Sequence, residues 1–189
     1  MNLNNVSTAI LIAILITAAV IDMRRHRLPN SLTVSAALVG LSLQYTLQGW
    51  HGLLDGLTGF VTGFVLFLPF YALRWMGAGD VKLMAAVGIF LGWPLSLLAT
   101  GLSMGAGTLT AFYLLAVRGG LYDYLCRYSS MAKCLFFTGS FSYLPPKPGD
   151  ASTQLFPFAL AIFLGTLATL GYGGRLNPFI DFLGRFAHV

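Results

Sequence analysis

Residues Val6–Arg27, VSTAILIAILITAAVIDMRRHR, form an apolar run that ends in an aspartate and is followed at once by a basic cluster. The run from Val6 to Asp22 is close to the length that crosses a bilayer as a helix. The five residues before it, MNLNN, carry no Lys or Arg, so the pattern is unlike that of a secretory signal peptide. Because Lys and Arg gather on the cytoplasmic side, we expect the N-terminus outside and Asp22 at the cytoplasmic face.

The rest of the chain has the same apolar character. Of its 189 residues, 57% are hydrophobic and 9% are charged, against about 25% charged residues in soluble domains. This composition predicts an all-α, polytopic membrane protein: a six-span helical bundle that forms one integral-membrane domain over residues 1–189. The expected spans are about 6–22, 31–47, 54–73, 81–92, 95–117 and 155–170, with a short external turn at Gln48–Gly52 and one long cytoplasmic loop at about 118–153.

The distribution of basic residues supports this orientation. Of the 11 Lys and Arg residues, those at 24, 25, 27, 74, 82, 118, 127, 133 and 147 fall on the cytoplasmic side of the expected spans, and those at 175 and 185 fall outside. The opposite orientation would invert this ratio. The net charge of +5 therefore reflects membrane topology, and we expect a lipid bilayer and no nucleic acid as a partner.

Two of the six aspartates occupy unusual positions. Asp22 closes the first expected span and Asp80 opens the fourth, so this topology places both at the cytoplasmic membrane face. An ionisable residue at the edge of a membrane segment is a functional candidate. The other four fall in expected turns, loops or the C-terminal tail, where a solvated carboxylate costs little: Asp55, Asp123, Asp150 and Asp181.

Two carboxyl groups that meet cannot both ionise easily, because like charges a few ångströms apart raise one pKa. The charged member can then take a proton from water as the water attacks a peptide carbonyl, while the protonated member polarises that carbonyl. This is aspartic-protease chemistry, which needs no cofactor. The three histidines are scattered along the chain, so we expect no metal site.

The stretch MGAGDVK, Met76–Lys82, surrounds Asp80 with small residues. Gly77 and Gly79 can adopt positive φ and lack a side chain, so an extended substrate could approach Asp80 closely. The structural alternative is that Asp80 caps the helix that follows and Gly-Ala-Gly is a tight turn.

Local signals also predict helix ends and helix contacts. Asn30 or Ser31 is expected to cap the second span. Glycines spaced four apart favour close packing of helices in lipid. The pairs are Gly59 with Gly63, Gly88 with Gly92, and Gly101 with Gly105.

Three stretches resemble the signatures of the type IV prepilin peptidases. IDMRRHRLPN (Ile21–Asn30) is similar to the family's first signature, and GAGDVKLMAA (Gly77–Ala86) to its second, the GxGD motif. FPFA (Phe156–Ala159) is similar to the short motif before the last core helix of the family. The resemblance covers the chain from about Asp22 to Gly165.

The resemblance implies a six-span aspartyl peptidase of the bacterial inner membrane. Such enzymes cut the basic leader from type IV prepilins or pseudopilins at the cytoplasmic face, so the implied partner is a prepilin leader peptide. The catalytic pair carries over to Asp22 and Asp80. We expect the other motif residues to bind the substrate: Gly77, Gly79, Pro29, Asn30, Lys82 and Pro157.

One departure from the family pattern concerns a second activity. Long, bifunctional members carry paired CxxC motifs in a cytoplasmic domain and methylate the new pilin N-terminus, whereas this sequence begins directly with a span and contains no CxxC. It resembles the short, peptidase-only branch found in tight-adherence (Flp) pilus systems, and we expect no N-methyltransferase activity. Two other functions stay open: a small channel or carrier with Asp22 and Asp80 in an ion path, and a pilus-assembly scaffold without catalysis.

Overall fold

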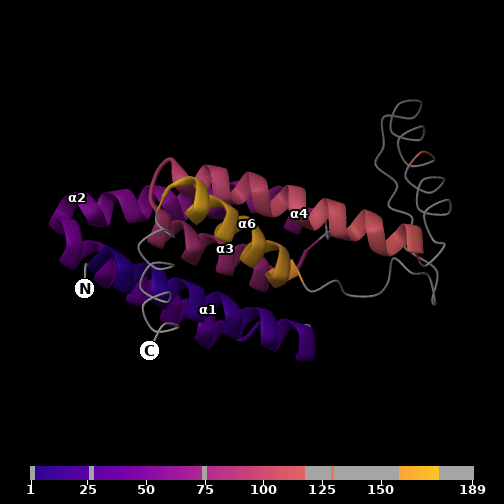
Figure 1. The fold of residues 1–189 in the computed structure, drawn as a ribbon, viewed down its shortest axis with the longest axis horizontal. Coiled ribbons are helices and arrows are strands. Elements are labelled where there is room, and N and C mark those ends of the chain that lie inside the picture. The colour runs from indigo at the N-terminus through magenta and orange to yellow at the C-terminus, as the bar shows by residue number, and fades with distance from the viewer. Residues whose placement is uncertain (1–2, 26–27, 74–75, 118–128, 130–157, 175–189) are drawn as a thin grey trace, which may run out of the picture. The chain divides into compact units, whose positions relative to one another are not determined.

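The computed structural model describes residues 3–25, 28–73, 76–117, 129 and 158–174 (Figure 1). Throughout these residues the regular secondary structure is helical, which confirms the all-α class. The helices are α1 (Leu3–Arg25), α2 (Asn30–Ala72), α3 (Ala78–Leu91), α4 (Leu95–Val117) and α6 (Phe158–Tyr172). Apart from residue 129, the expected loop at 118–153 lies outside the described residues. The chain divides into two units, Met1–Gly107 with Pro157–Val189, and Thr108–Phe156; the contacts below belong to the first.

Three helices in the described part of the chain are long and apolar enough to cross a membrane. They are Asn5–Arg25, Asn30–Ala72 and Leu95–Tyr113. Helices α3 and α6 have 14 and 15 residues, or about 21 and 22 Å at 1.5 Å per residue, which is less than the ~30 Å hydrocarbon core of a bilayer. The apolar helices are those of a membrane protein, whereas the six crossings and the N-outside orientation stay predictions.

Helix α2 is two helical segments joined at Gly49. This residue has φ 61° and ψ −139°, a conformation that glycine adopts without the steric penalty of a side chain. The chain folds back there, because a Cβ added to Gly56 would lie 3.3 Å from Cγ of Gln44. Residues twelve apart on a straight helix would be about 18 Å apart. The break falls within the turn expected at Gln48–Gly52.

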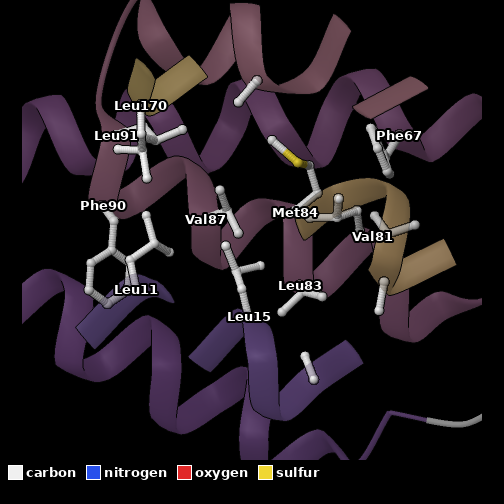
Figure 2. Close-up of a cluster of buried hydrophobic side chains, with 14 residues drawn as sticks. Leu11, Leu15, Phe67, Val81, Leu83, Met84, Val87, Phe90, Leu91 and Leu170 are labelled. Atoms are coloured by element: carbon white, nitrogen blue, oxygen red, sulfur yellow. The ribbon is translucent and has the colours of Figure 1, made fainter. Parts of the chain in front are cut away.

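Helix α3 is the centre of the core. From Val81 to Leu91 every residue is buried except Lys82, and a helix that is apolar all round requires partners on all sides. α3 contacts α1, α2 and α6. Figure 2 shows the side chains that surround it, which come from all three neighbours: Leu11, Leu15, Phe67 and Leu170.

Glycines allow α2 to approach α3 at backbone distance. Gly59 and Gly88 face each other so closely that a Cβ on either would collide with the carbonyl oxygen of the other. A Cβ on Gly63 would lie 2.6 Å from the carbonyl oxygen of Met84. In the other half of α2, a Cβ on Gly40 would lie 2.8 Å from the ring of Phe90. Both halves of α2 therefore pack directly on α3.

The expected glycine contacts are correct for only part of the chain. Gly59, Gly63 and Gly88 lie at helix crossings, as described above. Gly101 and Gly105 on α4 would meet nothing within 4 Å if they carried a Cβ, so the expectation of close packing at this third pair is wrong within the described structure. Spacing alone does not say which face of a helix meets a neighbour.

Two polar side chains of α2 hold the C-terminal end of α3. Gln44 is buried and donates from Nε2 to the carbonyl oxygen of Ile89 at 2.8 Å, which satisfies one of the last carbonyls of the helix. Oδ1 of Asp55 accepts the backbone N–H of Trp93 at 2.9 Å. The expectation that Asp55 is a solvated turn residue is therefore wrong. Asp55 is a helical residue that stabilises the turn after α3.

Candidate active site

Asp22 lies in the last turns of α1 and is buried, with 6% of its surface exposed. Its Oδ2 atom accepts the backbone N–H of Ala159 at 3.1 Å. Ala159 is the second residue of α6, and the first N–H groups of a helix have no partner within the helix. The positive end of the helix dipole also favours a nearby anion. The start of α6 therefore holds the carboxylate of Asp22.

Asp80 is the third residue of α3 and is 8% exposed. Its Oδ2 atom accepts the backbone N–H of Gly77 at 3.1 Å. Gly77 occupies the N-cap position with φ −78° and ψ 154°. Asp80 thus stabilises the helix start from its third position, as the carboxylate of a capping box does. The alternative expectation that Asp80 is itself the N-cap is wrong.

The two carboxyl groups interact electrostatically at one end of the helical unit. Asp80 lies outside the three candidate spanning helices. Its burial, followed by the negative charge of Asp22, raises the pKa of Asp80 from 3.8 to about 7, although the hydrogen bond from Gly77 opposes the shift. A carboxyl with this pKa keeps its proton below neutrality and is about half protonated near pH 7, so the pair can hold one proton between two acids. Such a pair can carry out general acid–base chemistry on a water molecule.

The raised pKa of Asp80 predicts a pH-dependent stability. The folded state binds a proton that the unfolded state releases between pH 3.8 and about 7, so folding stability falls as pH rises through this window. The upper limit of the loss is on the order of 4 kcal/mol. Position 80 of the Asp80→Asn variant cannot ionise. As the pH rises from about 4 to 7, the melting temperature of the variant minus that of the wild type should therefore increase. Thermal unfolding in detergent measures this, and two parallel curves would contradict it.

The residues that follow α1 pack against the start of α3. A Cβ added to Gly79 would lie 2.9 Å from Cβ of Leu28. Nζ of Lys82 donates to Oδ1 of Asn30 at 2.9 Å. Pro29 is the N-cap of α2, and no side chain caps this helix, so the expectation that Asn30 or Ser31 does so is wrong. The LPN and GAGDVK stretches therefore form a single contact beside Asp80.

A pair of alanine substitutions tests this contact. Gly79→Ala should destabilise the protein by about 1–3 kcal/mol, because the new Cβ overlaps Leu28. Gly77→Ala should be neutral or slightly stabilising, by up to about 1 kcal/mol, because its φ and ψ suit alanine. In Gly77→Ala the nearest atom, Oδ2 of Asp80, would lie 3.4 Å away. Thermal unfolding of both variants in one detergent measures the difference, and equal losses of stability would refute the contact.

The structure shows the backbone conformation of some expected substrate-binding residues, but it does not test substrate binding. Gly77 has negative φ, and Gly79 lies in the first turn of α3, so positive φ is not the reason for either glycine. Pro157 lies outside the described residues. Substrate binding by Gly77, Gly79, Pro29, Asn30, Lys82 and Pro157 stays a prediction.

A small cavity lies away from the paired carboxyls. Its volume is about 70 Å³, and it is lined by residues near the start of α1, the fold of α2 and the ends of α3 and α6: Ser7, Thr8, Leu11, Gln44, Leu47, Gln48, Asp55, Phe90, Leu91 and Leu170. None of the expected site residues lines it. Within the described residues, no group of three or more His, Cys, Asp or Glu side chains could hold a metal ion.

Apolar helices and two interacting buried carboxyls define a helical membrane protein with an acidic pair. A family model, the type IV leader peptidase family, matches residues 9–115. The matched segment is more than half of the chain and includes Asp22 and Asp80. The chain belongs to the type IV leader peptidase family.

Curated relatives agree with the family. The chain is 40% identical over 98 residues to a type 4 prepilin-like proteins leader peptide-processing enzyme of Escherichia coli O78:H11, covering 47% of this chain and 35% of that protein. It is 35% identical over 95 residues to a prepilin leader peptidase/N-methyltransferase of Myxococcus xanthus, covering 47% and 28%. A protein with the latter description from Pseudomonas putida is 32% identical over 111 residues, covering 55% and 38%. The matches thus span about a third of each relative. No solved structure matches the chain.

Proposed function

We propose that this protein is a membrane aspartyl endopeptidase that removes the leader peptide of type IV prepilins. The observation that carries the proposal is the interaction of two buried carboxyls, Asp22 and Asp80, in which burial and then the negative charge of Asp22 raise the pKa of Asp80. Membership of the leader peptidase family and the described activities of the relatives supply the substrate class. The expected positive-inside topology supports cleavage at the cytoplasmic face, and the resemblance to the family supports the bacterial inner membrane as the location.

The environments of the two acids suggest their roles. Asp22 receives an N–H from the start of α6, which favours its ionised form, so it is the base that takes a proton from the attacking water. Asp80, with a pKa of about 7, is the acid that donates its proton to the carbonyl oxygen of the scissile peptide. A tetrahedral gem-diol forms, and Asp80 is now ionised while Asp22 carries the proton.

The second step breaks the peptide bond and restores the pair. Asp22 gives its proton to the leaving nitrogen, the C–N bond breaks, and one hydroxyl of the gem-diol returns a proton to Asp80 as the carboxylic acid forms. Water is consumed, and the products are the free leader and the pilin with a new N-terminal amine. Neither a covalent intermediate nor a metal takes part in this sequence.

We also propose that the protein is a peptidase without N-methyltransferase activity, of the kind that serves Flp-type prepilins or pseudopilins. Two of the relatives reported above are described as both peptidase and N-methyltransferase. The sequence of this chain has no CxxC motif, which is the feature that the resemblance associates with the longer, bifunctional members.

The test uses purified protein in detergent and synthetic prepilin peptides that include the leader. We expect one cut between leader and pilin, detected as two products by mass spectrometry, and no mass increase of 14 Da (about one methyl group) when S-adenosylmethionine is added. Intact peptide, together with ion flux into proteoliposomes, would instead establish the channel or carrier. Intact peptide without ion flux would instead favour the role of a pilus-assembly scaffold without catalysis.

A further inference from the structure

We propose that Gly107 on α4 and Phe158 at the start of α6 are positioning residues for Asp22. They act through the backbone N–H of Ala159, whose location they set. The inference rests on the proposed function only for its activity measurement, because the hydrogen bond itself can be followed without substrate.

A hydrogen bond links the start of α6 to α1. Ala159 is fully buried, and its N–H donates to Oδ2 of Asp22 at 3.1 Å. Since Ala159 is in the first turn of α6, it has no intrahelical acceptor for this N–H. The carboxylate of Asp22 therefore supplies the acceptor for this N–H. A shift of the start of α6 would move the donor away from Asp22 and break the hydrogen bond.

Phe158, the residue before Ala159, packs against Phe67. The ring of Phe158 meets the ring of Phe67 edge to face, with centroids 5.8 Å apart and an interplanar angle of 77°. Phe67 is fully buried on α2, so its side chain cannot change position without disturbing the packed core. Edge-to-face aromatic pairs are favoured beyond the burial of their surface, because the positive edge of one ring meets the negative face of the other. One side of the Phe158 ring is therefore fixed.

The Phe158 ring also lies against the backbone of α4. Gly107 is buried, and a Cβ there would lie 2.6 Å from Cζ of Phe158 and closer still to Cε2. A side chain at position 107 would collide with the ring, so Phe158 lies where it does because this residue is glycine. Glycine at 107 thus determines where Phe158 lies, and the next N–H along the chain is the donor to Asp22.

Further along α6, a second contact keeps the helix against α4. Gly165 approaches Ser103 so closely that a Cβ would lie 2.6 Å from its Cα. Oγ of Ser103 donates to the carbonyl oxygen of Ile162 at 3.5 Å. Because α6 is held there, a collision at Gly107 would displace mainly its first turn, which carries the Ala159 N–H.

Two alanine variants on the same helix test the inference. Gly107→Ala should push the Phe158 ring and lower kcat for leader cleavage by about ten- to a hundredfold, since a misplacement of ~1 Å costs up to about 10² in rate. KM should be unchanged, because Gly107 is buried and acts through the position of Asp22. Gly105→Ala is the matched control: a Cβ there meets nothing within 4 Å, and kcat should equal that of the wild type.

A second substitution separates positioning from general damage. Phe158→Leu removes the two ring atoms nearest to Gly107, Cε2 and Cζ, so the double variant Gly107→Ala/Phe158→Leu should recover at least part of the lost kcat. A loss in Gly107→Ala that Phe158→Leu does not relieve, or equal kcat in Gly107→Ala and Gly105→Ala, would overturn the proposal.

Hydrogen exchange of the Ala159 amide gives a measurement that needs no substrate. The Asp22→Ala variant loses the acceptor, so this single amide should exchange at least about tenfold faster, and Gly107→Ala should produce the same change while Gly105→Ala does not. Unchanged exchange in Gly107→Ala would refute the positioning role whether or not prepilin is cut. The expected exchange pattern in a protein that cuts no prepilin would uphold the positioning of Asp22 and refute only the proposed peptidase.

Discussion

Replacing either Asp22 or Asp80 by asparagine should abolish leader cleavage, with kcat reduced by about 10²–10⁴-fold, the range for loss of a general acid or base. Asparagine can still accept the N–H of Ala159 or of Gly77, so the fold and membrane insertion should survive while proton transfer is lost. The double variant should be little worse than either single variant, because residues that act as one unit are not additive. Cleavage of a prepilin peptide, followed by mass spectrometry, measures kcat.

Asp55→Asn is the matched control for these variants. Asp55 is a partly buried carboxylate that, like the other two, accepts a backbone N–H, in this case that of Trp93, yet it lies at the opposite end of α3 from Asp80. Since asparagine keeps an acceptor there, the control should cleave at the wild-type rate. Wild-type rates in Asp22→Asn and Asp80→Asn, in protein that elutes as a single folded species, would contradict the acidic pair as the catalyst.

The contact of Gly59 with Gly88 should be the most sensitive point of the fold. Gly88→Val should destabilise the protein by at least about 3 kcal/mol, at the upper end for an overpacked core. The reason is that the added carbons collide with the carbonyl oxygen of Gly59, and a backbone cannot move aside as a flexible side chain can. Because α3 carries Asp80, separation of α2 from α3 should also reduce activity.

Unfolding in detergent, followed by heat or denaturant, measures this effect. Gly101→Val is the control, since that position on α4 is exposed and a Cβ there meets nothing within 4 Å. Its stability should match the wild type within about 0.5 kcal/mol, as for substitutions away from contacts. If Gly88→Val and Gly101→Val had the same stability, the backbone crossing of α2 and α3 would be refuted.

The helices themselves could be predicted because they depend on local properties of the chain. The expected span at 95–117 coincides with α4, and the span at 81–92 corresponds to α3, Ala78–Leu91. Apolar length and the flanking glycines or prolines are sufficient for such assignments. The start of α2 illustrates the limit: Asn30 has a capping side chain, but that side chain binds Lys82 of α3 instead.

The contacts between helices could not be predicted, because the same local pattern occurs with and without a neighbour. Glycines four apart occur at Gly59 with Gly63, which pack on α3, and at Gly101 with Gly105, which meet nothing. Asp55 has the sequence context of a turn residue but accepts the N–H of Trp93. Which face of a helix is covered depends on the whole packing arrangement.

The sequence by itself determined that the chain is helical and apolar enough for a membrane, and it singled out Asp22 and Asp80 as the two unusual carboxylates. Charge counting and hydropathy need no knowledge of neighbours. Only the tertiary structure decided what holds those carboxylates: Gly77 for Asp80, and the N–H of Ala159, 137 residues away in the chain, for Asp22. Contacts at such sequence separations exist only once the helices have packed, since no local property of either segment specifies the distance between them.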